Sequence, residues 1–326
     1  MLIMKIPFFS SLMTRSRRAG AGFVAAISGN GVHFAQVKYV AGRPQVVTYA
    51  FRQVPGTKNS GLTSAALEKL RKELKVGDFQ FTTMLAPGEY QLLQVEAPNV
   101  PDEELKAAVR WSIKDSLNYH VDDAMLDVLR IPSDQAAGER KKSLYVVAAS
   151  NEVLKRRIEL FEHANFNLCV IDIPEMAQRN IAALYEQESR ALALLAFDES
   201  GCLLTFTSDG ELYLARRIEI SVGQLQDANE SLRQQYYDRL ELEVHRSIDH
   251  FDRQFKHLPV RRLLVSVPSN TGLVEMLGNS LDLPVERLEL SEVMDMDEES
   301  ELGSDEARVY AFYALGAALR QEGGTL

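Results

Sequence analysis

A pattern of three short strands joined by tight turns occurs twice in this chain of 326 residues. Residues 22–54 and residues 191–218 each contain three apolar runs, separated by turn residues such as Gly29-Asn30-Gly31 and Asp198–Gly201. In both places, helical patterns and further buried strands follow the three runs. A repeated layout of this kind predicts an α/β protein with two similar halves, each built on a sheet that begins as a three-strand meander.

The helix expected after Pro101 has two different faces. Proline and the three acids that follow it favour a helix start, because they suit the unpaired N–H groups of a first turn. An apolar stripe with a spacing of four residues predicts a face turned to a core: Leu105, Val109, Ile113 and Leu117. Trp111, the only tryptophan, lies on the opposite side. Two interpretations stay open: Trp111 packs at a seam between subdomains, or it anchors a binding partner, since tryptophan is enriched at binding hot spots.

Three later stretches complete the expected elements. Residues 227–257 show the clearest amphipathic helical pattern. Residues 289–306 carry nine acids and no base, which predicts an exposed, mobile loop. Residues 307–320 are expected to form a closing helix with Phe312 and Gly316 facing inward.

Composition excludes some classes of function. The formal net charge of −10 argues against nucleic-acid binding, which requires a positive field. Cys169 and Cys202 both lie in apolar, strand-like runs, so they are interpreted as reduced core residues of a cytosolic protein. No cluster of histidines and cysteines has the spacing of metal ligands, and we expect no metal site.

The first 21 residues are predicted to be a basic leader. Their apolar run is short and precedes the arginines, which fits neither a secretory signal nor a membrane-spanning helix of about 20 apolar residues. Two possibilities remain, a disordered leader and peripheral contact with an anionic membrane surface.

Three motifs in order indicate a family. Arg110-Trp111 in the helix described above, ELEVHRSIDHF at 241–251 and YALGAALR at 313–320 together resemble the PilM family, the cytoplasmic actin-like proteins of type IV pilus assembly. Within it, the chain looks closest to the MshI branch of mannose-sensitive haemagglutinin pilus biogenesis. The resemblance covers about residues 22–320.

The resemblance implies an actin-like (RNase H-like) ATPase fold of two lobes. The first lobe would span 22–190, with an insertion of the type found in FtsA and PilM at about 88–164. The second lobe would span 191–326, and its C-terminal helix would return to the first. The implied location is the cytoplasm, peripheral to the inner membrane. The implied partner is the cytoplasmic segment of a PilN-like inner-membrane protein, with Trp111 and Arg110 as candidate contacts.

The nucleotide positions of the family are changed in this chain. PilM-like proteins have a first phosphate turn of the form D-I-G-x-x-x-V-K, in which the Asp helps to place magnesium and the Gly admits phosphate. Ala26, Ser28 and His33 occupy the Asp, Gly and Lys positions here. In the second turn Asp198 matches the expected acid, but Gly201 comes one position late.

The second lobe shows a third change, because Ser266-Val267 replaces a pair of glycines that accommodates nucleotide, while Gly272 is retained. Backbone can approach a phosphate closely only where side chains are absent. We therefore expect a degenerate site without ATP or magnesium, whose remnants are Asp198, Gly201 and Gly272, in a protein that is not an enzyme. The alternatives are an ATP-binding switch or weak ATPase that regulates pilus assembly, and a polymerising filament.

Overall fold

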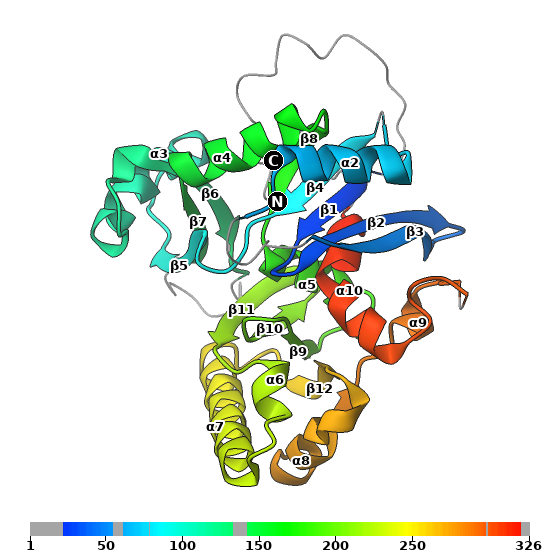
Figure 1. The fold of residues 1–326 in the computed structure, drawn as a ribbon. Helices are drawn as coiled ribbons and strands as arrows, with labels where there is room; N and C mark the ends of the chain where they lie inside the picture. The colour runs from blue at the N-terminus through cyan, green and yellow to red at the C-terminus, as the bar shows by residue number, and fades with distance from the viewer. Residues whose placement is uncertain (1–21, 55–60, 78, 133–141, 298, 321–326) are drawn as a thin grey trace. The chain divides into compact units, whose positions relative to one another are not determined.

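The computed structural model describes residues 22–54, 61–77, 79–132, 142–297 and 299–320 (Figure 1). Internal contacts divide the chain into two compact units. Among the described residues, the first unit contains 22–34 and 51–173, and the second contains 35–50 and 174–320. The predicted leader lies outside the described residues, and the predicted lobe limits, 22–190 and 191–326, stay a prediction.

The first five-stranded sheet has the strand order β3-β2-β1-β4-β8. Its strands are β1 (Phe23–Ile27), β2 (Gly31–Val40), β3 (Arg43–Gln53), β4 (Gln80–Met84) and β8 (Asn167–Asp172). β4 runs parallel to both β1 and β8. The two helices α2 (Ser64–Leu74) and α4 (Asn151–His163) contact each other. Phe81 and Phe161 both pack edge-on against Phe166, so strand and helix residues share one aromatic core.

Residues 90–150, which fall within the predicted insertion of about 88–164, form a small sheet covered by a helix. The strands are β5 (Tyr90–Glu96), β6 (Ala124–Arg130) and β7 (Ser143–Ser150), and β7 is central and antiparallel to both neighbours. The helix is α3 (Asp102–Ile113), followed by the 3-10 turns Lys114–Ser116 and Val121–Asp123. The predicted stripe is confirmed for Leu105, Val109 and Ile113, which are buried against the sheet. Leu117 follows the end of α3 and packs on the same core from the loop.

The second unit repeats the topology of the first sheet. Its strand order is β11-β10-β9-β12-β13. The strands are β9 (Ala191–Phe197), β10 (Cys202–Ser208), β11 (Glu211–Ile218), β12 (Val260–Ser266) and β13 (Val285–Arg287). β9, β10 and β11 are antiparallel neighbours, and β12 is parallel to β9 and β13. The two meanders expected from the sequence are therefore confirmed.

Helices accompany this sheet along the rest of the chain. They are α5 (Pro174–Ala182), α6 (Val222–Leu225), α7 (Glu230–Gln254), the 3-10 turn Ser269–Thr271, α8 (Leu273–Ser280), α9 (Leu290–Val293) and α10 (Asp305–Ala318). α10 packs on α5, and the approach is close at Gly316, where a Cβ atom would lie 2.3 Å from the carbonyl oxygen of Ala177. Only glycine fits at that crossing.

The acidic segment 289–306 is not simply the exposed loop that its charge predicts. Leu290, Met294 and Leu302 are almost fully buried. The backbone of Asp295 forms an isolated parallel bridge to Gln45 of β3. Apolar residues spaced between the acids therefore attach the segment to the second unit.

Candidate functional site

The turn between β1 and β2 corresponds to the first phosphate turn of the resembled family. The N–H of Ser28 donates to the carbonyl oxygen of Gly31 at 2.9 Å. The Ser28 hydroxyl lies 3.0 Å from Asn30 Oδ1 and 3.2 Å from the Gly31 oxygen. A Cβ atom on Gly31 would lie 2.3 Å from the carbonyl oxygen of Arg52 in β3. The neighbouring strand thus requires this glycine, without any ligand.

The turn between β9 and β10 closes in the same way, and its polar groups are held by an acid. The N–H of Asp198 donates to the Gly201 oxygen at 2.9 Å. Asp198 Oδ1 accepts from the N–H of Ser200 at 2.7 Å, from its hydroxyl at 2.8 Å and from the N–H of Gly201 at 3.0 Å. A Cβ atom on Gly201 would lie 2.5 Å from the Ile218 oxygen in β11. Gly201, like Gly31, is therefore required by the neighbouring strand.

The shared closing hydrogen bond aligns the two turns. Ser28 and Asp198 both donate across a four-residue turn, so they occupy equivalent positions. Counting back two residues, Ala26 of the first turn is equivalent to Ala196 of the second. The motif comparison instead matched Asp198 to the acid position that Ala26 occupies. In this register Ala26 and Ala196 hold that position, one in each turn.

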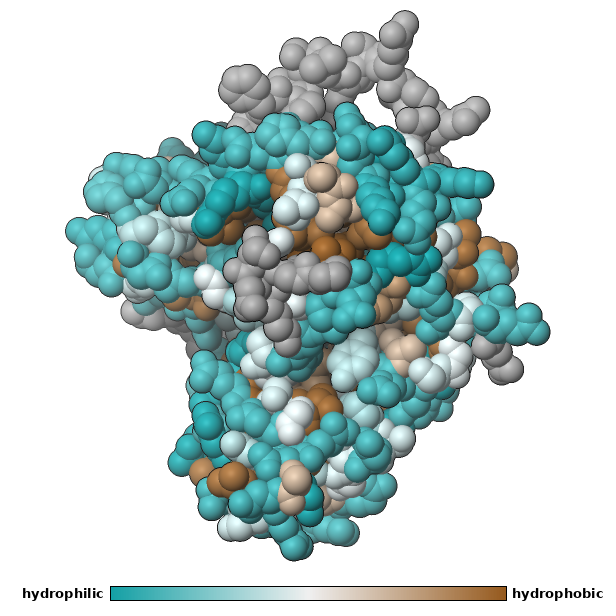
Figure 2. All heavy atoms as spheres, in the orientation of Figure 1, coloured by the Kyte–Doolittle hydropathy of each residue, from teal (hydrophilic) through white to brown (hydrophobic). Residues whose placement is uncertain are grey.

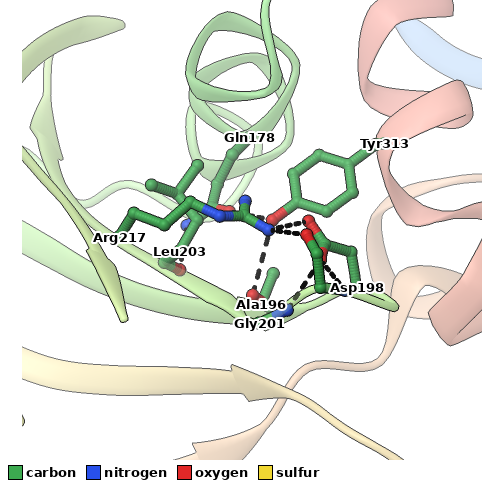
Figure 3. A network of polar contacts seen from close by, with 8 residues as sticks. Gln178, Ala196, Asp198, Gly201, Leu203, Arg217 and Tyr313 are labelled. Atoms are coloured by element: carbon green, nitrogen blue, oxygen red, sulfur yellow. Dashed lines mark hydrogen bonds and ion pairs between the residues drawn. The ribbon is translucent and has the colours of Figure 1, made fainter. Parts of the chain in front are cut away.

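Arg217 of β11 completes the second turn (Figure 3). Its guanidinium lies 2.5 Å from Asp198 Oδ2 and 2.6 Å from the Ser200 hydroxyl oxygen. Both side chains of the ion pair are only 22% exposed, so the charges are partly desolvated and oppositely matched. Gly31 approaches the carbonyl oxygen of Arg52, and Gly201 approaches that of Ile218, so Arg52 and Ile218 are equivalent. The residues just before them, Phe51 and Arg217, are then equivalent as well. The first turn therefore has no such arginine.

A buried amide and a phenol link helices of the second unit to the strands β9 and β10 that flank this turn. Gln178 of α5 is fully buried, and its Nε2 lies within 3.0 Å of Leu194 O, Leu203 O and Thr205 Oγ1. The hydroxyl of Tyr313 in α10 lies 3.2 Å from Gln178 Oε1 (Figure 3). Burial, and after it the nearby Asp198 carboxylate, raises the pKa of Tyr313 well above its ordinary value. The phenol is therefore a neutral hydrogen-bonding group.

The remaining predicted residues of the nucleotide site lie beyond the second turn. Ser266 ends β12 opposite Ala196, and both Ser266 and Val267 are almost fully buried. Gly272 precedes α8 with a φ of +68°, and a Cβ atom there would meet nothing within 4 Å. Asp198 and Gly201 are thus joined by a hydrogen bond, whereas Gly272 serves as the left-handed residue that begins another helix.

Neither a metal centre nor a membrane span is found in the part of the chain that the structure describes. Within the described ranges, no three histidine, cysteine, aspartate or glutamate side chains are grouped so that they could bind a metal ion. Within the same ranges, no helix combines the length and the apolar character needed to cross a bilayer.

The two candidate partner contacts on α3 differ in their surroundings. The Arg110 guanidinium donates to the carbonyl oxygens of Val121 and Ala124, at 2.6 and 3.1 Å, and so holds the start of β6. Trp111 is 67% exposed, the highest value for a large hydrophobic side chain among the described residues. Its own unit therefore does not bury it at a seam. On the face drawn in Figure 2 hydrophobic residues occupy limited groups within a mainly hydrophilic surface, which makes such exposure notable.

Sequence reasoning missed Arg217, Gln178 and Tyr313. Arg217 reaches the turn from β11, Gln178 of α5 reaches carbonyl oxygens of β9 and β10, and Tyr313 of α10 reaches Gln178. No local motif records contacts across such separations. The one available signal was Arg217 itself, a charged residue in a strand that is otherwise mostly buried.

Comparison with known proteins gives a fold but no sequence family. No family model and no curated protein matches the sequence. A solved structure titled the PilM–PilN type IV pilus biogenesis complex is similar with a TM-score of 0.70 and 19% identity, over 92% of this chain and 98% of that chain. The chain has an actin-like fold. The predicted fold class is therefore confirmed.

Two further solved structures are similar at lower scores. The cytoplasmic domain of EpsL, an inner-membrane component of the type II secretion system of Vibrio cholerae, has a TM-score of 0.48 and 12% identity, over 92% of this chain and 95% of that chain. A Bacteroides thetaiotaomicron protein with an actin-like ATPase fold has a TM-score of 0.49 and 10% identity, over 84% and 92%.

Proposed function

We propose that this protein is a non-enzymatic scaffold in the assembly of a type IV pilus of the mannose-sensitive haemagglutinin kind. It binds the cytoplasmic segment of a PilN-like inner-membrane protein and works at the cytoplasmic face of that membrane. The fold likeness to PilM, seen in a complex with PilN and extending over 92% of this chain, supports the kind of partner. The motifs at Arg110-Trp111, 241–251 and 313–320 support the same family.

The observation that carries the non-enzymatic part is the occupation of the second turn. A phosphate turn works by pointing free N–H groups at the ligand. In this chain the N–H groups of Ser200 and Gly201 both donate to Asp198. An incoming phosphate would also meet the negative charge of Asp198, which is paired with Arg217, and Glu199 beside it in the turn adds a second negative charge. Buried Ser266 and Val267 stand where the family has glycines.

Calorimetric titration with ATP and magnesium tests this part of the proposal. We expect no heat of binding at micromolar to millimolar nucleotide. Micromolar binding would overturn it and favour the ATP-binding switch. Sedimentation with and without nucleotide tests the filament, for which we expect no pelleting.

Trp111 is the proposed anchor for the partner segment. A large aromatic side chain that is 67% exposed in its own unit loses much water-accessible apolar surface when a partner covers it. We expect Trp111→Ala to weaken binding of a PilN-like cytoplasmic peptide by at least about tenfold, with unchanged thermal stability. Leu242→Ala is the matched control, because Leu242 is 47% exposed on α7 in the other unit. Equal affinities for the Trp111→Ala and Leu242→Ala proteins would remove Trp111 from the interface.

A further inference from the structure

The second turn has the donor set of an anion-binding site. Two successive backbone N–H groups, of Ser200 and Gly201, converge on one oxygen atom, and consecutive N–H groups of this kind form concave sites for phosphate and other oxyanions. The Ser200 hydroxyl adds a third donor to the same oxygen. The Arg217 guanidinium adds a charged one to the other oxygen of that carboxylate.

What fills this donor set is a side chain of the turn itself. Both oxygen atoms of the Asp198 carboxylate are used, Oδ1 by the turn and Oδ2 by Arg217. A carboxylate resembles one face of a phosphate in charge and in the spacing of its oxygens. Both charged side chains are only 22% exposed, so water screens the attraction between them less than it would at the open surface.

We infer that Asp198 is a built-in substitute for a bound oxyanion. The turn is an anion-binding turn that carries its own anion, and this holds it in one closed conformation without a ligand. The inference rests on the proposed loss of nucleotide binding and adds the cause of that loss in this unit. The ligand class that the turn would accept, once vacated, is a small oxyanion such as inorganic phosphate.

The first turn supports the inference by contrast. It closes through the same backbone hydrogen bond, but Ser28 occupies the position of Asp198 and Phe51 the position of Arg217. It therefore has neither the internal anion nor the cation that would balance an external one. It provides a control within the same molecule.

The test is to remove the internal anion and supply an external one. Asp198→Ala frees the donors and leaves Arg217 in place. We expect this variant to bind inorganic phosphate with a millimolar dissociation constant in a calorimetric titration, at least tenfold more tightly than the unmodified protein. Phosphate at ten times this dissociation constant should raise the Tm of the Asp198→Ala protein by about 3 °C, beyond any effect of sodium chloride at equal ionic strength.

Three further variants make the result decisive. Asp198→Ser copies the first turn, so it keeps a foldable turn if Asp198→Ala unfolds, and it should also respond to phosphate. Asp198→Ala/Arg217→Met lacks the cation and should not respond, and Ser28→Ala should not respond either. If phosphate stabilises Asp198→Ala and Asp198→Ser no more than sodium chloride does, Asp198 is only a turn cap and the inference is wrong. ATP binding by the unmodified protein would instead count against the proposed function.

Discussion

The turns that begin β2 and β10 have the same backbone and different chemistry. Each is closed by one hydrogen bond across four residues, and each ends in a glycine pressed against a carbonyl oxygen of the third strand. The first is capped by the neutral Ser28. The second is capped by the charged Asp198, which Arg217 neutralises. A repeated fold has kept the steric requirement of the turn in both units and has changed the polar groups.

This comparison separates two reasons for a glycine in a phosphate turn. One is the approach of a ligand, and the other is the approach of a neighbouring strand. Gly31 and Gly201 have the second reason in full, so their presence is no sign of nucleotide. Both turns have an alanine, Ala26 and Ala196, where the resembled family has an acid, which is what the proposed absence of nucleotide binding requires.

The largest expected effect comes from adding a methyl group to either glycine. Gly31→Ala and Gly201→Ala would place Cβ 2.3 and 2.5 Å from backbone oxygen atoms that cannot rotate away. We expect each to lower the free energy of unfolding by roughly 3 kcal/mol or more in urea titrations. Gly278→Ala is the control. Gly278 lies inside α8, and an added Cβ atom would be 3.9 Å from Val285 Cβ, which is an ordinary contact. A helical alanine there should be neutral or stabilising by up to about 1 kcal/mol.

The outcome decides whether the turns are sterically alike. Similar losses at both glycines, with none at Gly278, would confirm the shared requirement. If only one of the two turns tolerated alanine, the turns would not share the steric requirement, and the comparison would be wrong.

His33, beside the first turn, predicts a pH effect, and the equivalent position beside the second turn holds Leu203. It is 8% exposed, and its ring packs at a tilt against Phe51 with 4.6 Å between the ring centroids. Burial lowers the pKa of His33 from 6.5 to about 4. The unfolded histidine binds a proton as pH falls through 6.5, while the folded one does not. The contribution of neutral His33 to the free energy of unfolding is therefore fully present above pH 6.5. It falls by about 3 kcal/mol as pH is lowered to about 4.

Urea titrations from pH 7 to pH 4 measure this loss. His33→Leu gives β2 the residue that β10 has at the equivalent position, Leu203. The substitution should flatten this part of the pH profile. An unchanged slope in the His33→Leu protein would show that other groups cause the acid sensitivity.

The ion pair of the second turn should have a smaller effect. Arg217→Met leaves the Asp198 carboxylate partly buried with only the turn donors, and we expect a loss of about 1–2 kcal/mol. A double-mutant cycle with Asp198→Asn isolates the pair, and the coupling should fall when salt is added. Strict additivity of the two substitutions would mean that Arg217 contributes nothing to the turn beyond its packing.

Much of this architecture was predictable from the sequence, because strand patterns are local. The two meanders and the apolar face of α3 follow from residue spacing alone. Spacing also placed Trp111 on the other face of α3, but it left open whether Trp111 packs at a seam or is exposed. The motif drew attention to Asp198 and Gly201, but it matched Asp198 to the acid position that the closing hydrogen bond gives to Ala196. Arg217 was not recognisable from a motif, because it reaches the turn through the register of β10 and β11.

Other features depended on tertiary contacts in the same way. Leu290, Met294 and Leu302 are buried within a segment whose nine acids predicted exposure, because a few apolar contacts outweighed many solvated charges. Arg110 was predicted beside Trp111 as a partner contact, yet its guanidinium is bonded to carbonyl oxygens 11 and 14 residues ahead. Whether it also contacts a partner stays a prediction.

The smallest expected effect is at Ser28, and it measures how far the two caps differ. Among the described residues, its hydroxyl bonds to groups of its own turn, Asn30 and Gly31, in a partly exposed place where water can replace it. Ser28→Ala should therefore cost about 0.5 kcal/mol in a urea titration. Gly31 keeps the backbone hydrogen bond in either protein, so the turn itself should survive. A loss above about 2 kcal/mol would be as large as the contribution of a charged cap. The neutral cap of the first turn and the charged cap of the second would then not differ in strength.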